Sequence, residues 1–440
     1  CTVSEESSQN DDTMPRLQLL RRILFHQKPS HILFYYITIS TVSSFAIPNN
    51  AYSSKKSVAS MSITDSTRKS SHQNTTGNSA FSNMHASFTT WNTQSQPLAT
   101  SKCIPPMSSS SHKGSSGRVG VLGGSAQYTG APYYAAMSAL KTGSDLAFVF
   151  CADEAAVPIK CYSPELMVAP VYNAKQFDDG INQEQEQQQK MVDEMVEKVT
   201  SFLPRMHCLI VGPGLGRCPL VFKATARIMQ AAIDANVGLV VDADALFLLT
   251  LDEYKHLFDD LHGSNKVVLT PNVVEYKRLL KTYCNIKSNN LHQNIFEGTS
   301  LQHAIIVKKG QSDRVAIAAD VHHDGEAKEL ICEEEGGLKR SGGIGDVLAG
   351  CIGTFVAWNS ILYGANAASA DDEDEERGDL LLSCWTACCV TKRSTRAAFE
   401  KKRRAMTAPD VLEEIGPVLD DMTIDIDSEE TLKSLLSSSL

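Results

Sequence analysis

The segment from Ser341 to Gly350 places three glycines and one carboxylate directly before an apolar helical pattern. Glycines let the backbone approach a ligand and turn its N–H groups inward, and the start of a helix adds a positive dipole end. The segment therefore predicts an anion site, beside which Asp346 could accept a proton from a substrate hydroxyl. Taken alone, the pattern favours a simpler role for Asp346 as a helix cap, because Asp is common at helix N-termini.

A second polar pair, Asn272 and Glu275, follows the apolar run that ends at Leu269. On a helix that begins near Pro271, the two side chains share one face and could address the same ligand or hydrated metal. A capping box, in which the same two side chains satisfy the backbone at the helix start, explains the pair as well. The pair alone leaves both roles open.

Asp242 and Asp244 stand two residues apart at the end of another apolar run. Residues two apart lie on one face of a regular strand, but the strand ends here, so the two side chains need not address the same site. We therefore expect only Asp242 in the site, in contact with substrate or a water-bridged metal, and we expect Asp244 to cap the next helix. No metal can be assigned by direct ligation, since no Cys/His grouping has the spacing of a zinc site.

Short apolar runs that alternate with helix-length patterns must position these residues. The runs predict strands near 119–122, 146–151, 208–211, 239–242, 266–269 and 304–308. Such alternation is typical of an α/β fold with a central, mostly parallel sheet covered by helices on both faces. In these folds, ligands bind at the carboxyl ends of the strands, where the polar segments above are found.

The chain divides by composition into four parts. Residues 1–50 resemble a targeting leader, with a basic stretch and then an apolar run too short and too rich in Ser and Thr for a stable membrane span. This leader predicts an organellar location, mitochondrion or plastid, or a cytoplasmic one if translation starts downstream. The other three parts are a disordered Ser-rich linker at 51–116, the catalytic domain at 117–423 and an acidic tail at 424–440.

Two polar stretches inside the domain are expected to be insertions or solvated loops. One is the Gln-rich piece at 182–190, which could run into a polar helix, and the other is the acidic run at 371–376. The whole chain of 440 residues has a net charge of -10, which argues against nucleic acid or an anionic membrane as a partner. Its 12 cysteines are expected to be buried thiols in a reducing compartment.

The N-x-x-E and G-x-G-D patterns together resemble the double signature of the ribokinase-like superfamily. Four further motifs are similar to its ATP- or ADP-dependent NAD(P)H-hydrate dehydratase branch, and they lie at 123–132, 211–216, 241–246 and 309–310. The resemblance covers about Arg118 to Val418. At Thr270-Pro271-Asn272 the chain departs from the bacterial T-P-H-x-G-E pattern and resembles the eukaryotic form, which implies ATP as the phosphoryl donor.

The resemblance implies a ribokinase-like fold and the ATP-dependent dehydration of the S-form of NADH or NADPH hydrate back to the reduced cofactor. ATP would phosphorylate the hydroxyl and phosphate would then leave, with Mg²⁺ shared between nucleotide oxygens and water. The resemblance also implies NAD(P)H hydrate and ATP as ligands and a functional pairing with a separate hydrate epimerase. It leaves open whether the protein forms a homo-oligomer.

The resemblance assigns three sets of site residues by position. The catalytic set is Asp346, Gly343 and Gly345. The hydrate-binding set is Gly214, Gly216, Asn272, Val273, Val274, Glu275, Tyr276, Lys277, Arg278 and Asp346. The ATP-binding set is Lys309, Gly310, Gln311, Ser312, Asp313, Gly336, Gly337, Leu338, Lys339, Arg340, Ser341, Gly342, Gly343, Ile344 and Gly345.

Three other functions compete with this one. A ribokinase-like kinase of a vitamin precursor could use the same anion site and release a stable phosphoester. A nucleotide-sensing pseudoenzyme would be favoured by loss of Asp346 or the glycines, and both are present. A Rossmann oxidoreductase is disfavoured, because Gly212-x-Gly214-x-Gly216 lacks the full G-x-G-x-x-G spacing.

Overall fold

The computed structural model describes residues 88–261, 266–284, 296, 298–321, 327–363 and 379–423. Three predicted segments lie outside these residues, namely the leader 1–50, the acidic run 371–376 and the tail 424–440.

One sheet of nine strands organises the described part of the chain, in the order β3-β2-β1-β4-β5-β6-β7-β8-β9. The strands are β1 (Arg118–Leu122), β2 (Leu146–Ala152), β3 (Met167–Tyr172), β4 (Cys208–Val211), β5 (Gly238–Val241), β6 (Val267–Leu269), β7 (Ile305–Lys308), β8 (Asp313–Val321) and β9 (Ala327–Cys332). Neighbours are parallel from β3 through β7, and the pairs β7·β8 and β8·β9 are antiparallel. The predicted α/β class with a mostly parallel sheet is therefore confirmed.

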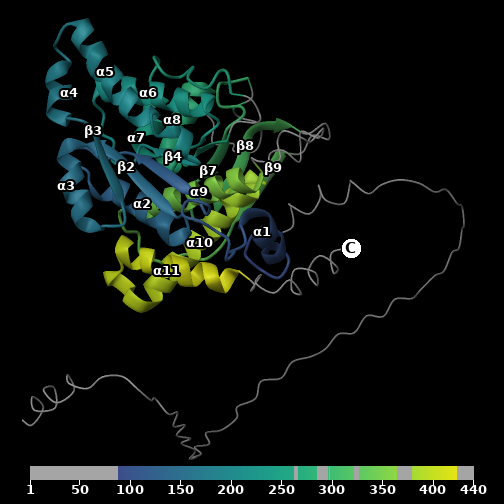
Figure 1. Ribbon diagram of the computed structural model, residues 1–440. Helices are drawn as coiled ribbons and strands as arrows, with labels where there is room; N and C mark the ends of the chain where they lie inside the picture. Colours follow the sequence, from purple (N-terminus) through teal and green to yellow (C-terminus); the bar gives the residue numbers. More distant parts are fainter. Residues whose placement is uncertain are drawn as a thin grey trace, which may run out of the picture. The chain divides into compact units, whose positions relative to one another are not determined.

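Helices cover both faces of this sheet (Figure 1), with α5 and α6 on one side and α2, α9 and α10 on the other. They are α1 (Ser95–Cys103), α2 (Gly130–Thr142), α3 (Asp153–Tyr162), α4 (Ala174–Gly180), α5 (Gln185–Thr200), α6 (Pro219–Asp234), α7 (Ala243–Leu248), α8 (Val273–Tyr283), α9 (Ile344–Tyr363), α10 (Leu380–Lys402) and α11 (Ala408–Met422). Two 3₁₀ turns, η1 (Leu203–Arg205) and η2 (Arg403–Ala405), complete the set. Helix α11 packs outside this second layer, against α2 and α10.

The six predicted strands are all present, because each central strand is a continuous apolar run. Every residue of β4, β5 and β6 is buried, as expected for parallel strands covered on both faces. The strands β3, β8 and β9 were not predicted. Strand β3 is only half-buried over its first residues, and the β8–β9 hairpin carries polar side chains such as Arg314 and Glu329, which pair with each other.

Helix α9 is the central helix beneath the sheet and the one that begins in the glycine-rich segment. A Cβ on Gly350 would overlap Ser138 Oγ and Ala135 O of α2, and one on Gly353 would lie 2.6 Å from Ile210 Cδ1 of β4. These two glycines therefore allow close packing against α2 and the sheet. Among the described helices, α9 alone has the length and apolar composition to cross a membrane, and 72% of that stretch is buried inside the protein.

The Gln-rich piece at 182–190 is mostly helical rather than a loop. Helix α5 begins at Gln185 and buries Val192, Met195 and Val199 at helical spacing, so an amphipathic pattern extends the polar start into a packed helix. The cysteines of the described residues form no disulfide, and Cys384, Cys388 and Cys389 of α10 are buried.

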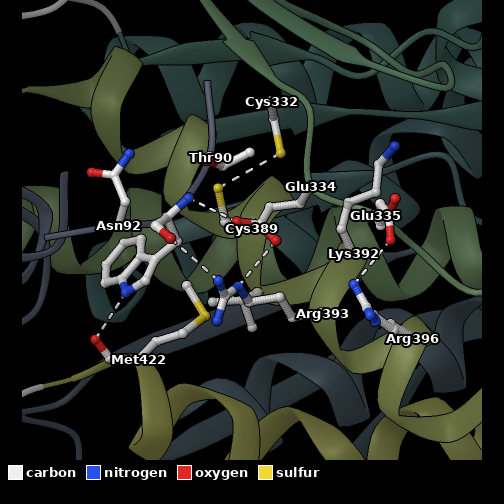
Figure 2. A network of polar contacts seen from close by, with 12 residues as sticks. Thr90, Asn92, Cys332, Glu334, Glu335, Cys389, Lys392, Arg393, Arg396 and Met422 are labelled. Atoms are coloured by element: carbon white, nitrogen blue, oxygen red, sulfur yellow. Dashed lines mark hydrogen bonds and ion pairs between the residues drawn. The ribbon is translucent and has the colours of Figure 1, made fainter. Parts of the chain in front are cut away.

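The predicted linker is wrong for residues 88–116, because this stretch is folded against the domain. The Phe88 and Trp91 rings contact the buried Trp385 ring of α10, with centroids 5.0 and 6.2 Å apart, and both are less than 10% exposed. The indole Nε1 of Trp91 donates to Met422 O at 3.1 Å, and its backbone N donates to Glu334 Oε1 at 2.7 Å (Figure 2). Isolated aromatic residues in a Ser-rich stretch carry no periodicity, so this packing could not be predicted from the sequence.

We expect a truncation that removes residues 1–115 to be less stable than one that removes residues 1–87. The longer truncation loses the burial of Phe88 and Trp91, and loss of large buried aromatics costs at least about 3 kcal/mol. Urea unfolding of the two truncated proteins measures the difference. Equal unfolding midpoints would show that the packing of this segment contributes nothing to the stability of the domain.

Candidate active site

The carboxyl ends of β5 and β7 bring Asp242 and Lys309 together. Asp242 follows the last residue of β5, and Lys309 follows the last residue of β7, two strands away in the sheet. Lys309 Nζ donates to Asp242 Oδ1 at 2.7 Å, and the two side chains are only 18% and 3% exposed. The predicted placement of Asp242 in the site is consistent with this geometry, and the partner that the structure adds is Lys309.

The first turn of α9 lies beside this ion pair. A Cβ on Gly345 would sit 3.6 Å from Lys309 Nζ and, beyond its own stretch of chain, within 4 Å of no other described atom, so Gly345 faces the ammonium across open space. The first hydrogen bond of the helix runs from Val347 N to Gly343 O at 2.9 Å. The N–H groups that precede Val347 are therefore available to an anion at the helix N-terminus.

The electrostatics of the site centre on Asp346. Burial raises the pKa of this carboxyl to about 7, and the nearby carboxylate of Asp242 adds to the increase while Lys309 opposes it. Burial alone would lower the pKa of Lys309, but the carboxylates of Asp242 and Glu275 outweigh burial and raise it. Burial likewise raises the pKa of Glu275, against the influence of Lys309. The cluster thus holds a permanent cation next to an acid that titrates near neutral pH.

Asn272 and Glu275 form the capping box that the sequence left open. Asn272 Oδ1 accepts from Val274 N and Glu275 N at 2.9 and 3.0 Å, and Glu275 Oε2 accepts from Asn272 N at 2.8 Å. Glu275 also lies close enough to Lys309 to influence its pKa. Capping and a place in the site therefore coexist for Glu275.

The prediction that Asp244 caps the next helix is wrong. The intervening Ala243 has φ 48°, so the chain turns there into α7 and Asp244 no longer follows the strand. Asp244 Oδ2 accepts from Gly216 N at 3.0 Å, and its Oδ1 accepts from Arg217 Nε at 3.2 Å. Its role is to hold the predicted hydrate-binding loop at Gly216.

The start of α2 links the predicted hydrate loop to the glycine-rich segment. A Cβ on Gly214, which has φ 63°, would lie 2.9 Å from Tyr128 Cβ. A Cβ on Gly343, which has φ 90°, would lie 2.6 Å from the ring of Tyr134. Both glycines are therefore required by a left-handed backbone and by close neighbours. Tyr128 of the unassigned motif at 123–132 thus packs against the hydrate loop, and Tyr134 of α2 packs against the glycine-rich segment.

The other predicted hydrate-binding residues divide into exposed and buried ones. Val273 and Val274 are 46% and 66% exposed at the first turn of α8, where they are open to a ligand. Tyr276 is 9% exposed and packs edge-on against Phe296, so its ring belongs to the core. Lys277 is exposed, and Arg278 lies 5.3 Å from the centroid of the Phe247 ring.

The predicted ATP-binding residues form two segments, 309–313 and 336–345. In the first segment, Asp313 is buried and its Oδ1 accepts from Gly310 N at 2.8 Å, so this side chain shapes the turn from within. In the second segment, Leu338 is 84% exposed and Arg340 is exposed, while Gly337 is buried against α10. The segments therefore present an open surface, while buried contacts of Asp313 and of α10 hold them in place.

Sequence reasoning missed three residues beside the predicted site. They are Arg217, which pairs with Asp244, and Lys392 and Thr395, which contact the nucleotide segments. Arg217 lies 4.2 Å from the centroid of the Phe247 ring, and Lys392 donates to Gly310 O at 3.1 Å. Lys392 and Thr395 are distant in sequence from the segments that they touch, on a helix whose other residues are mainly apolar. Arg217 directly follows the Gly212–Gly216 motif, and that adjacency was the one available signal.

Solved structures share this fold. A hypothetical protein from Streptococcus mutans matches with a TM-score of 0.53 and 20% identity, covering 74% of this chain and 99% of that one. A ribokinase-like superfamily protein from Enterococcus faecalis matches with a TM-score of 0.51 and 20% identity, covering 74% and 95%. The fold and the glycine-rich helix start thus define a ribokinase-like α/β protein.

The sequence relatives narrow this class. Residues 119–417 match a family model described as NAD(P)H-hydrate dehydratase. The mouse ATP-dependent (S)-NAD(P)H-hydrate dehydratase is 35% identical over 319 residues, 71% of this chain and 81% of the relative. The Saccharomyces cerevisiae protein of the same name is 35% identical over 336 residues, 73% and 95% of the two chains. The chain belongs to the NAD(P)H-hydrate dehydratase family.

Proposed function

We propose that the protein is an ATP-dependent dehydratase of the S-form of NADH or NADPH hydrate. The observation that carries the proposal is the placement of Asp346 at the start of α9, half-buried close to Lys309, with a pKa of about 7. A carboxylate of this basicity can take a proton from an alcohol at neutral pH. The adjacent N–H groups and ammonium can stabilise the charge of a transferring phosphoryl group.

The reaction has two steps. In the first, Asp346 accepts the proton of the hydrate hydroxyl while the hydroxyl oxygen bonds to the γ-phosphorus of ATP and ADP leaves. In the second, the ring nitrogen supplies an electron pair, the carbon–oxygen bond breaks and phosphate leaves. Loss of a proton from the adjacent ring carbon restores the reduced nicotinamide. Phosphorylation is needed because hydroxide is a poor leaving group.

Lys309 has a role that its ion pair with Asp242 defines. The pair holds the ammonium at a fixed place next to Gly345, which is where a phosphoryl group on the helix start would lie. Because the carboxylates of Asp242 and Glu275 raise its pKa, Lys309 stays charged throughout the working pH range. It therefore acts as an electrostatic stabiliser and not as a proton donor.

The residues also fit a Mg²⁺ ion carried by the nucleotide. Within the described residues, no group of three or more His, Cys, Asp or Glu side chains is arranged to hold a metal directly. Mg²⁺ in nucleotide sites keeps several waters and uses one or two carboxylates beside the phosphates, and Asp242 and Glu275 are carboxylates of this kind near Lys309. Bound there through water, Mg²⁺ would supply neutralisation of the phosphate charge.

The decisive experiment incubates the protein with the S-form of NADH hydrate, ATP and Mg²⁺. We expect the absorbance of reduced nicotinamide to return, with one ADP and one phosphate formed for each NADH. A vitamin-precursor kinase would instead leave the hydrate unchanged and phosphorylate an added alcohol to a stable ester. If the protein turns over neither the NADH hydrate nor the NADPH hydrate, the proposed function is contradicted.

A further inference from the structure

Lys392 of α10 makes polar contacts with the turn at 309–313. Its ammonium donates to Gly310 O at 3.1 Å and to Gln311 O at 2.6 Å, and it lies 3.5 Å from Asp313 Oδ2. The Lys392 and Asp313 side chains are only 12% and 5% exposed. A buried ammonium with three oxygen partners fixes the positions of all three, since the loss of any one would leave a buried polar group unsatisfied.

The same side chain touches the second nucleotide segment. A Cβ on Gly336 would lie 3.4 Å from Lys392 Cδ and 3.0 Å from Thr395 Oγ1. Thr395 Oγ1 also accepts a hydrogen bond from Gly337 N at 3.1 Å. The stem of Lys392 therefore lies against one segment while its charged end binds the other.

The neighbouring turn of α10 anchors the residues just before this second segment (Figure 2). Arg393 Nε lies 3.1 Å from Glu334 Oε2, and Arg396 NH1 lies 3.0 Å from Glu335 Oε2. Both arginines are more exposed than Lys392, so these pairs are the weaker part of the contact. Residues 392–396 thus present one continuous support to residues 334–337.

We propose that α10 sets the separation of the two nucleotide-binding segments, and that Lys392 is a positioning residue for ATP. The proposal rests on the proposed function, since it takes 309–313 and 336–345 as the ATP site. The contacts of Lys392 are with the two nucleotide segments, and none of them is with Asp346 or the hydrate loop. Its loss should therefore change the affinity for ATP and leave the chemical step largely intact.

The test compares three variants of the full chain. Lys392→Met keeps the stem and removes the ammonium, Lys392→Arg keeps the charge, and Lys401→Met is the matched control. Lys401 also lies on α10 and donates to both carboxylate oxygens of the buried Glu414, at 2.8 and 2.7 Å. Its removal likewise leaves a buried carboxylate without its cation, away from both nucleotide segments.

For Lys392→Met we expect the calorimetric Kd and the KM for ATP to rise about tenfold or more, the size expected on loss of a charged hydrogen-bonding group. The kcat at saturating ATP and the KM for the hydrate should change less than about threefold. Lys392→Arg should recover part of the affinity. Lys401→Met should lower Tm about as much as Lys392→Met does, but it should leave the Kd for ATP unchanged.

An unchanged Kd for ATP in Lys392→Met would overturn the positioning role, and so would an equal increase in Lys401→Met. If Lys392→Met does not fold, Lys392→Arg and Thr395→Val decide the matter, because both are expected to weaken ATP binding. If the wild-type protein binds ATP but leaves the hydrate unchanged, the proposed function is contradicted and the positioning role of Lys392 is not. The binding comparison does not depend on turnover.

Discussion

Asp346→Asn should lower turnover of NADH hydrate by at least about 10²-fold while ATP binds as before. Asn keeps the size of the side chain and caps a helix about as well as Asp, but it cannot accept the hydroxyl proton. Steady-state rates, ATP affinity and Tm measured on this variant separate catalysis from capping. A normal turnover rate would remove Asp346 from the mechanism.

The pH dependence gives an independent check on the same group. The folded-state pKa of about 7 lies above the ordinary value of 3.8, so Asp346 is protonated and inactive as a base below pH 7. The kcat/KM of the wild type should therefore fall about tenfold for each pH unit below 7, and Asp346→Asn should lack this dependence on its residual rate. A wild-type profile flat from pH 5 to 8 would be incompatible with Asp346 as the base.

Stability should move in the opposite direction to activity. Because folding raises the pKa of Asp346, this group stabilises the protein below its ordinary pKa, and that contribution is lost as pH rises through about 7. Asn carries no charge to bury, so the variant should have an equal or higher Tm at pH 8. A large decrease in Tm would instead point to a structural role for the carboxylate.

The central sheet and the core of the site could be predicted from the sequence because their signals are local. Strands β4 to β6 are uninterrupted apolar runs, and Gly345 and Asp346 lie in one short motif. Asp244 was assigned wrongly because its partners, Gly216 and Arg217, lie in a loop that is distant in sequence. The sequence also does not show the positive φ of Ala243, which turns the chain between Asp242 and Asp244.

The remaining features depend on contacts between distant parts of the chain. Lys392 pairs with Asp313, which lies 79 positions earlier in the sequence, and Trp91 donates to Glu334, which lies near the other end of the domain sequence. A single sequence shows the types of these residues but not their pairing. The folded segment at 88–116 was missed for the same reason, since its stability comes from α10 and not from its own pattern.

Gly345→Val should reduce ATP-dependent turnover by about 10²-fold or more and leave the fold intact. Gly345 is the second residue of α9 and its φ lies outside the left-handed region, so a side chain is not excluded by backbone strain. A Cβ there would meet only Lys309 Nζ, at 3.6 Å, and the two methyl groups of valine would extend into the space beside it. The proposed function places the transferring phosphoryl group in that space, and a displacement of about 1 Å costs rates of this size.

The matched control for this variant is Gly416→Val in α11. Its added Cβ would meet only Lys141 O, at 3.9 Å, so it introduces the same side chain on a helix far from Lys309. Valine is no worse than glycine within a helix, so Gly345→Val should keep Tm within a few degrees of wild type. Gly416 precedes Pro417, whose ring crowds a Cβ at that position, so Gly416→Val should lower Tm at least as much and still keep activity. Only Gly345→Val should lose turnover and ATP affinity. Full activity in Gly345→Val would mean that the phosphoryl group does not pass the start of α9, and an equal loss in Gly416→Val would assign the effect to the helix change itself.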